Sequence, residues 1–407
     1  MALSYSTPGV YVEEVATGGR PISALGTSTA AFIGAAPLSN ARVNEAIPVN
    51  NWSQFVRTFT GENTPSTDLA RAVHGFFDNG GTRCYVVNIG NAKSIVGDAR
   101  KRTGLSVLET VDDVAIVAAP GYTDIASYDG IITHCKTMGD RIAILDPPQE
   151  VGVEDIDNLT KVAQVSGGGG EEGETSAKRK KDQGYRPPSN DRAAFYFPWI
   201  KIREPLASGN VIVNAAPSGH VAGVYARSDF TYGVHKAPAN ELINGALGLN
   251  YQITRQEQAP LNEAGVNCIR YFPDSGIRIW GARTLASDAQ WRYVNVRRLF
   301  LMVMKSIERG TNWTVFEPND ERTWKAIERD IRAFLMLLWR DGALKGTTPE
   351  QAFYVKCDAE TNPPEVINAG RLVTEIDMAP VKPAEFIIFR IGQWDGGAEV
   401  ETEGEGE

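Results

Sequence analysis

Short apolar segments that end in small or turn-forming residues recur through the first half of the chain. They are apolar on both faces, a pattern typical of strands buried inside a parallel sheet. Segments with helical spacing lie between them, as in Thr67–Asn79, where Leu69, Val73 and Phe76 recur at three- and four-residue steps. Strand and helix in alternation predict an α/β layer with a largely parallel sheet. The strand candidates are Thr29–Pro37, Cys84–Gly90, Asp113–Gly121, Arg141–Pro148 and Ala194–Ile200.

After Tyr251 the pattern becomes that of an α+β region. The segment Asp288–Arg309 begins with an N-cap candidate, Asp288, and presents one apolar face before Gly310. A second amphipathic helix is predicted from about Asp320 to Trp339, after the helix-start signal EPND. Strand-like segments follow at Arg371–Pro380 and Ala384–Gly392.

Both ends of the chain carry strong strand formers. The stretch TPGVYVEEV, Thr7–Val15, holds one β-prone run, and EFIIFRI, Glu385–Ile391, holds another. Apolar strands that are left unpaired invite pairing with another chain. Each terminal strand therefore either pairs inside its own domain or is donated to a neighbouring subunit. The pattern alone leaves both arrangements open.

Residues 166–188 interrupt the apolar pattern with a glycine run, an acidic patch and the basic run Lys178–Lys181. Because this segment has almost no apolar content, we expect a flexible, exposed loop. A basic run can bind nucleic acid, but its acidic neighbours nearly cancel the charge, and a solvated loop is the favoured interpretation. The acidic, glycine-rich stretch Trp394–Glu407 is expected to be disordered.

Composition narrows the class of protein. The chain has 407 residues, of which 42% are hydrophobic and 22% charged, which predicts a folded protein of two or three domains. A net charge of -9 argues against nucleic-acid binding driven by overall charge. The four cysteines are far apart and are expected to be buried, reduced thiols. No signal peptide or membrane span is visible, so we expect cytoplasmic synthesis without export by a standard secretory signal.

Catalytic and cofactor motifs give no positive signal. A formal GxGxxG, Gly168–Gly173, lies in the polar loop with two glutamates where a phosphate would sit. The adjacent residues His134 and Cys135 are best explained as a packed pair. Asp146, at the end of a predicted strand, is the best catalytic candidate, although a turn start before proline is favoured. We therefore expect no catalytic, cofactor or metal site.

Many segments, in this order along the chain, resemble the signature segments of contractile tail sheath proteins from phage tails and phage-like contractile injection systems. No counterpart can be placed for the loop 166–188. The matching segments are TPGVYVEEV, STAAFIGAA (Ser28–Ala36), GGTRCYVVNI (Gly80–Ile89), RIAILDPP, AFYFPWIKI, PSGHVAGVYARSD (Pro217–Asp229), GVHKAPAN (Gly233–Asn240), IRIWGARTL (Ile277–Leu285), YVNVRRLF (Tyr293–Phe300), FEPND (Phe316–Asp320), LWRDGAL (Leu338–Leu344) and APVKPAEFIIFRI (Ala379–Ile391).

The resemblance implies an α/β outer domain, residues 28–249, and an α+β inner domain, residues 250–383. The arms 1–27 and 384–407 would donate strands to small sheets in the inner domains of neighbouring subunits. Ala16–Ser23 and the region around Pro380–Pro383 would act as hinges. The exchanged residues would be Val10, Tyr11, Val12, Glu13, Val15, Phe386, Ile387, Ile388, Phe389 and Ile391.

The resemblance also implies partners. Copies of the chain would form a helical sheath of hexameric rings around an inner tube, with baseplate and terminal cap proteins at its ends. Neither nucleic acid nor direct membrane insertion is expected. The inner domain would face the tube, and a basic surface on the Asp288–Arg309 helix is a candidate contact, although a solvated or internally paired face is an equal alternative. Its residues are Arg292, Arg297, Arg298 and Lys305.

Three functional hypotheses follow. The leading one is a structural sheath subunit of a bacterial contractile injection system, whose particle is released on lysis or anchored to a membrane. The second keeps the same role within the tail of a phage virion. The third is an α/β enzyme with a helical oligomerisation domain and a ligand pocket around Asp146.

Overall fold

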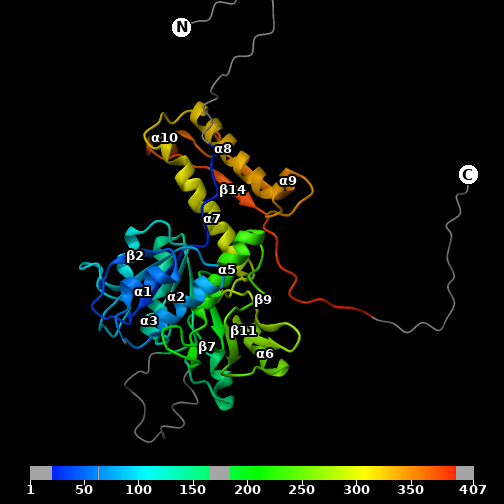
Figure 1. Cartoon of the computed structure of the whole chain (residues 1–407). Coiled ribbons are helices and arrows are strands. Elements are labelled where there is room, and N and C mark those ends of the chain that lie inside the picture. Colours follow the sequence, from blue (N-terminus) through cyan, green and yellow to red (C-terminus); the bar gives the residue numbers. More distant parts are fainter. Residues whose placement is uncertain (1–20, 63, 165–183, 391–407) are drawn as a thin grey trace, which may run out of the picture.

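The computed structural model describes residues 21–62, 64–164 and 184–390. Its main body is built on one nine-stranded mixed sheet (Figure 1). Six central strands are parallel, while antiparallel strands lie at both edges. In spatial order the strands are β2 (Ala46–Val49), β3 (Cys84–Asn88), β1 (Ala30–Gly34), β4 (Ile116–Ala118), β5 (Ile142–Leu145), β6 (Ala193–Phe197), β11 (Val266–Phe272), β12 (Gly276–Trp280) and β9 (Glu241–Leu242).

Helices cover both faces of this sheet. Successive side chains of a strand point to opposite faces, so Phe32 belongs to one buried cluster and Ala31 and Ile33 to the other. The first cluster includes side chains of α1 (Trp52–Phe59), α2 (Asp68–Asp78) and α5 (Ser218–Tyr232). The second includes η1 (Gly104–Thr110), α3 (Ile125–Met138), η2 (Val153–Leu159) and α6 (Arg255–Glu263).

Glycines allow α2 and α5 to approach closely. A Cβ on Gly219 would lie 2.3 Å from the Cα of Ala72, and one on Gly223 would lie 2.5 Å from the carbonyl oxygen of Phe76. Both distances are too short for any side chain, so the helix pair requires glycine at these positions. A smaller antiparallel sheet beside the main one has the order β10 (Ala246–Leu249), β7 (Ile200–Arg203) and β8 (Ile212–Ala215).

A second body contains two long helices and a two-stranded antiparallel ribbon. Helix α7 joins the two bodies, since its Leu301 packs into the sheet core while Leu299 and Val303 pack with α8 (Figure 1). The elements of this body are α7 (Val294–Thr311), η3 (Asn312–Thr314), α8 (Glu321–Arg340), α9 (Pro349–Ala352), β13 (Phe353–Lys356), α10 (Pro364–Asn368) and β14 (Glu375–Met378).

The five strand predictions of the first half and the helix at Thr67–Asn79 are confirmed. The helix predicted from about Asp320 is also confirmed, because α8 begins at Glu321, and the Asp320 carboxylate caps it by accepting a hydrogen bond from the Thr323 amide at 2.9 Å. The N-cap assignment of Asp288 is wrong. Its carboxylate accepts from the Gln290 amide at 2.9 Å in a local turn, and α7 begins only at Val294.

Two expected boundaries differ from the structure. The sheet does not end near residue 250, because β11 pairs in parallel with β6 and brings β12 and β9 with it. The loop expected at 166–188 contains ordered residues at its end: the amide of Tyr185 donates to the carbonyl of Asn158 at 2.8 Å. Most of that loop, residues 165–183, lies outside the described residues. The assignment of an outer and an inner domain stays a prediction.

Candidate assembly site

The ribbon of β13 and β14 has two open edges among the described residues. Its strands pair from Phe353 with Met378 to Lys356 with Glu375. The amide of Ala379 donates to the carbonyl of Ala352 at 2.8 Å, which fixes the phase of the hydrogen-bond alternation. In an antiparallel pair, the backbone N–H and C=O groups of successive residues point alternately toward and away from the partner strand. With this phase, the backbone groups of Phe353 and Val355 on one strand, and of Ile376 and Met378 on the other, point outward. Each edge can therefore accept a further strand.

One face of the ribbon is already covered. The side chains of Phe353 and Val355 are buried against α7 and α8, and those of Ile376 and Met378 pack partly against the same cluster. Tyr354 lies on the opposite face and is 48% exposed. An added strand would extend this arrangement, with alternate side chains directed toward the helices.

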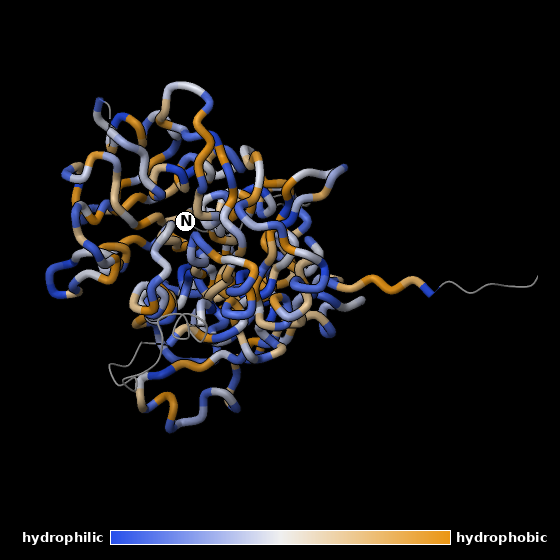
Figure 2. Tube along the Cα trace, turned by 90° about the horizontal axis from the view of Figure 1, so that it is seen from below, coloured by the Kyte–Doolittle hydropathy of each residue, from blue (hydrophilic) through white to orange (hydrophobic). Residues whose placement is uncertain are grey.

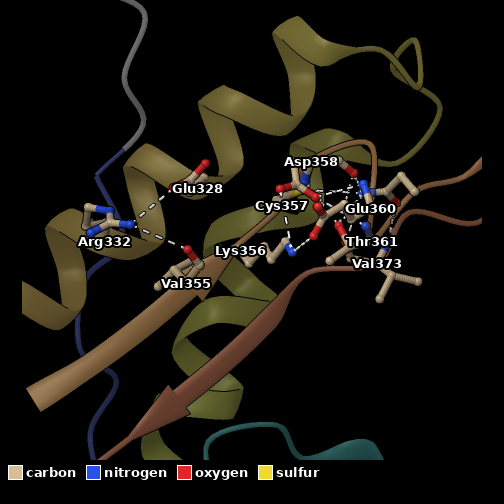
Figure 3. A network of polar contacts seen from close by, with 10 residues as sticks. Glu328, Arg332, Val355, Lys356, Cys357, Asp358, Glu360, Thr361 and Val373 are labelled. Atoms are coloured by element: carbon tan, nitrogen blue, oxygen red, sulfur yellow. Dashed lines mark hydrogen bonds and ion pairs between the residues drawn. The ribbon is translucent and has the colours of Figure 1, made fainter. Parts of the chain in front are cut away.

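Polar contacts hold the ribbon and its connecting loop (Figure 3). On the open edge of β13, the guanidinium of Arg332 donates to the carbonyl of Val355 at 3.4 Å and pairs with Glu328 at 3.2 Å. In the loop, Asn362 exchanges two hydrogen bonds with the backbone of Val373, at 2.7 and 3.0 Å. These hydrogen bonds hold the loop between the strands. Within residues 21–62, 64–164 and 184–390, the polar side-chain contact to the outward backbone groups of β13 is this long one from Arg332, whose side chain is 47% exposed.

The C-terminal segment leaves the body with its apolar side chains in solvent. It is the hydrophobic stretch that projects at the right of Figure 2, and within the described residues no strand pairs with 384–390. Ile391, also expected to be exchanged, lies outside the described residues. The exposed fractions are 73% for Phe386, 74% for Ile387, 80% for Ile388 and 83% for Phe389.

The N-terminal exchange residues Val10, Tyr11, Val12, Glu13 and Val15 lie outside the described residues. The segment that follows them is docked along α7, as the dark-blue trace in Figure 1 shows.

Three contacts dock this N-terminal segment. Ile22 is buried in the α7–α8 core, and a Cβ on Gly310 would lie 2.6 Å from its side chain. The amide of Leu25 donates to the Ser306 hydroxyl at 3.0 Å. The carbonyl of Thr27 accepts from the Arg298 guanidinium at 3.0 Å. Of the expected linker Ala16–Ser23, the end at Ile22 is therefore held against α7, and residues 16–20 lie outside the described residues.

Three of the four basic residues expected to face a tube are engaged within the subunit. Arg297 is buried and pairs with Asp191 at 3.0 Å. Arg298 is buried against the ring of Tyr225 and is bonded to both carboxylate oxygens of Asp229. Lys305 pairs with Asp140. The exposed basic surface is therefore not seen; the internally paired alternative holds for these three, and only Arg292 is exposed.

Asp146, the catalytic candidate of the enzyme hypothesis, has a structural role. Its buried carboxylate accepts from the amide and hydroxyl of Ser218, at 2.8 and 2.7 Å, and so caps the N-terminus of α5 from another part of the chain. Burial raises the pKa of Asp146 to about 7, although hydrogen bonds from Ser218 and Gly121 oppose this. Neither a free catalytic carboxylate nor the simple turn start predicted before the prolines describes this residue.

Other candidate chemistry is also internal to the fold. The four cysteines are buried and unpaired, as expected. Burial, together with the nearby Arg141, lowers the pKa of His134 to about 4, so its ring is neutral. Within residues 21–62, 64–164 and 184–390, no group of three or more His, Cys, Asp or Glu side chains could hold a metal ion. None of the helices described there is long and apolar enough to cross a membrane.

Sequence reasoning missed the residues that dock the two terminal segments. Ile22, Gly310 and Glu385 lie far apart along the chain and form no motif. A glycine inside α7 was interpreted as a helix stop, although α7 continues to Thr311. Gly310 was the one signal for this docking in the sequence, since a glycine within a helix often permits close approach of another segment.

Profiles of two known protein domains match successive parts of this chain. The profile of the phage tail sheath protein central domain matches residues 104–285, and that of the phage tail sheath C-terminal domain matches residues 286–393. The second match contains α7, α8 and the ribbon.

Solved structures agree over nearly the whole chain. The sheath of the extracellular contractile injection system PVC, in its contracted state, is 30% identical, with a TM-score of 0.75, and the match covers 97% of this chain and 99% of that one. The contracted helical sheath of the anti-feeding prophage is 28% identical, with a TM-score of 0.72, and covers 96% and 100%.

Curated relatives match over shorter stretches. A prophage major tail sheath protein of Pseudomonas aeruginosa (strain UCBPP-PA14) is 30% identical over 194 residues, 46% of this chain and 48% of that protein. The tail sheath protein of Burkholderia phage BcepMu is 24% identical over 82% of this chain and 67% of its own length. The match thus spans about half of the first relative and two thirds of the second.

These matches define a structural protein of tail-like assemblies rather than an enzyme. The chain belongs to the phage tail sheath family.

Proposed function

We propose that this chain is the repeating subunit of a helical contractile sheath that surrounds an inner tube and drives it through a target envelope. The observation that carries the proposal is the pairing of two complementary features in one subunit. Among the described residues, the ribbon of β13 and β14 offers two open edges, and residues 384–390 of the C-terminal segment pair with no strand. The N-terminus also carries strand-forming sequence, at Thr7–Val15. Two edges and two terminal strand formers give one candidate donor for each acceptor.

Strand donation explains how such subunits become a tube. An added strand satisfies the outward backbone groups of Phe353 and Val355 on one edge, or of Ile376 and Met378 on the other. It also buries alternate apolar side chains against the helices of the acceptor. Because donor and acceptor are different surfaces, the contact is head-to-tail, and a head-to-tail contact that does not close builds a helix.

The same connections permit contraction. Each subunit stays joined to its neighbours by its arms while its two folded bodies move as units. The extended sheath is a kinetically trapped state, and the contracted sheath buries more contacts, so no nucleotide is consumed. In this arrangement the body with the ribbon faces the tube and the nine-stranded sheet faces outward. Further partners are the tube protein, a baseplate and a terminal cap.

A bacterial contractile injection system is favoured over a phage virion tail. The support is the extent of the structural likeness: the injection-system sheaths are matched over 99% and 100% of their length, with TM-scores of 0.75 and 0.72. The gene neighbourhood tests this choice, because capsid and terminase genes beside this one would favour the virion.

Two deletions test strand donation. Removal of residues 386–407 keeps the intramolecular contacts of Glu385, and removal of Met1–Gly18 keeps the docking of Ile22. Both shortened chains are expected to fold as monomers by circular dichroism and to form no tubes by negative-stain electron microscopy under conditions in which the full chain does. Tubes formed by either deletion would contradict the proposal.

A further inference from the structure

The C-terminal segment is fastened to its own subunit at one point just before it enters solvent. Glu385 lies in a pocket formed by Asn262 at the end of α6, by Arg283 after β12 and by Tyr293 before α7. The guanidinium of Arg283 contacts both carboxylate oxygens, at 2.9 and 2.6 Å. The amide of Asn262 donates to one oxygen at 2.9 Å, and the Tyr293 hydroxyl donates to the other at 3.3 Å.

The pocket is rigid because its residues are fixed independently of Glu385. Arg283 donates through Nη1 to the carbonyl of Asn262 at 2.9 Å, and its backbone amide donates to the buried side chain of Asn267 at 2.7 Å. Arg283 and Tyr293 also form an antiparallel bridge between their backbones. The pocket is thus held by the nine-stranded sheet, the opposite body from the ribbon.

The chain between the ribbon and this pocket is held as well. Pro380 bridges to Leu344, and the amide of Val381 donates to the carbonyl of Ala343 at 3.2 Å. Together with Pro383, whose ring restricts its backbone, these contacts leave little freedom in the region predicted to be a hinge. Exposure changes abruptly at the pocket: the Glu385 side chain is 20% exposed and Phe386 is 73% exposed.

We infer that Glu385 is the positioning residue of the C-terminal arm, an intramolecular anchor that fixes where and in which direction residues 386–391 leave the subunit. This inference rests on the proposed strand donation. The anchor holds the arm against the sheet body. The position and direction of the strand that a neighbour receives therefore depend on the position of that body. The hinge of this arm therefore begins after Glu385, not at Pro380–Pro383.

The anchor has a defined effect on assembly. An arm that is held at its exit point loses less conformational freedom when it enters the neighbour's ribbon. Without the anchor the arm remains intact, but about four more residues, 382–385, are free to move, and its strand is presented at a wider range of positions. Loss of the anchor should therefore raise the concentration needed for assembly without changing the folded monomer.

The test uses Glu385→Gln in the full chain, which keeps the shape and removes the charge, together with Tyr293→Phe, which removes one donor. Glu45→Gln is the matched control, because Glu45 forms an exposed ion pair with Arg42. We expect monomers with unchanged circular dichroism and faster hydrogen exchange at residues 382–385, which follow the last of the other contacts. The assembly threshold, measured by sedimentation of tubes, should rise about tenfold for Glu385→Gln, since the freed residues must be ordered again when the arm enters the neighbour's ribbon. Tyr293→Phe should give a smaller rise and Glu45→Gln none.

The experiments distinguish an error in the anchor inference from an error in the strand-donation proposal. If residues 386–407 are needed for tubes but Glu385→Gln assembles at the wild-type threshold, the anchor inference alone is wrong. If Glu385→Gln lowers the threshold, the pocket restrains the arm against assembly, and the inference is again overturned. If the chain that lacks residues 386–407 forms tubes, the strand-donation proposal is wrong.

Discussion

The exposed apolar side chains of the C-terminal arm give the sharpest quantitative prediction. In an extended strand, Phe386 and Ile388 point to one face and Ile387 and Phe389 to the other. Three quarters or so of each side chain is in solvent in the free subunit, from 73% to 83%. Full burial of such a side chain contributes about 1.5–3 kcal/mol, so burial of one pair against a neighbour's ribbon would contribute about 3 kcal/mol for each subunit added.

Replacement of one pair by serine removes this contribution. A loss of about 3 kcal/mol corresponds to roughly a hundredfold rise in the concentration at which tubes form. The two variants are Phe386→Ser with Ile388→Ser, and Ile387→Ser with Phe389→Ser. Because all four side chains are exposed in the monomer, its free energy of unfolding should change by less than about 0.5 kcal/mol in either variant.

The assay measures tubes and monomer stability in the same samples. Sedimentation across a dilution series gives the assembly threshold, and urea unfolding of the dilute chain gives the stability. At least one variant should raise the threshold strongly at unchanged stability. Unchanged thresholds in both variants would refute the reasoning, and so would a large loss of monomer stability.

Three further predictions concern the folded subunit. Gly310→Ala should displace Ile22 and cost about 1–3 kcal/mol, with increased hydrogen exchange at residues 21–25; an unchanged exchange pattern would contradict the docking. Arg298→Ala leaves the buried carboxylate of Asp229 unpaired and should destabilise the chain by about 3–5 kcal/mol in urea unfolding, so a near-neutral effect would argue against the pair. The pKa of Asp146 is raised from 3.8 to about 7, so the stability linked to its proton is present below 3.8 and lost as pH rises through about 7. Asp146→Asn should make the free energy of unfolding less dependent on pH between about 4 and 7. If the variant keeps the wild-type slope, the pH dependence belongs to another group.

The anchor pocket predicts the opposite pH dependence. Burial raises the pKa of Glu385, but hydrogen bonds from Arg283 and Asn262 outweigh it, and the pKa lies below the usual 4.5. The stabilisation of the arm's exit point is therefore complete above pH 4.5 and is lost as pH falls through the lowered pKa. The protection of residues 382–385 against hydrogen exchange, taken relative to the intrinsic exchange rate at each pH, should fall only in acid. A loss of this protection between about pH 5 and pH 8 would contradict the ionised carboxylate.

The local sequence pattern was sufficient to predict an element when the signal for that element lies within one short segment of the chain. Strand β1 was predictable because all five of its residues, AAFIG, are apolar or small and buried. Helix α8 was predictable because its cap and one apolar stripe lie within one segment. Helix α5 gave no amphipathic signal, since it is buried on most sides and packs through Gly219 and Gly223.

The remaining features depend on residues brought together by the fold. The late start of α7 follows from the bridge between Arg283 and Tyr293, which keeps the preceding residues out of the helix. The pairing of Arg298 with Asp229 and of Glu385 with Arg283 joins positions 69 and 102 residues apart. Sequence alone identified charged residues on the α7 segment, but it could not distinguish an exposed basic face from a set of internal ion pairs.

The most direct test of strand donation is a helical reconstruction by electron cryomicroscopy of tubes formed by the full chain. We predict a four-stranded sheet in each subunit, in which β13 and β14 are flanked by residues 10–15 of one neighbour and residues 386–391 of another. Tubes in which the ribbon keeps two strands, or in which both arms fold back onto their own subunit, would contradict the account.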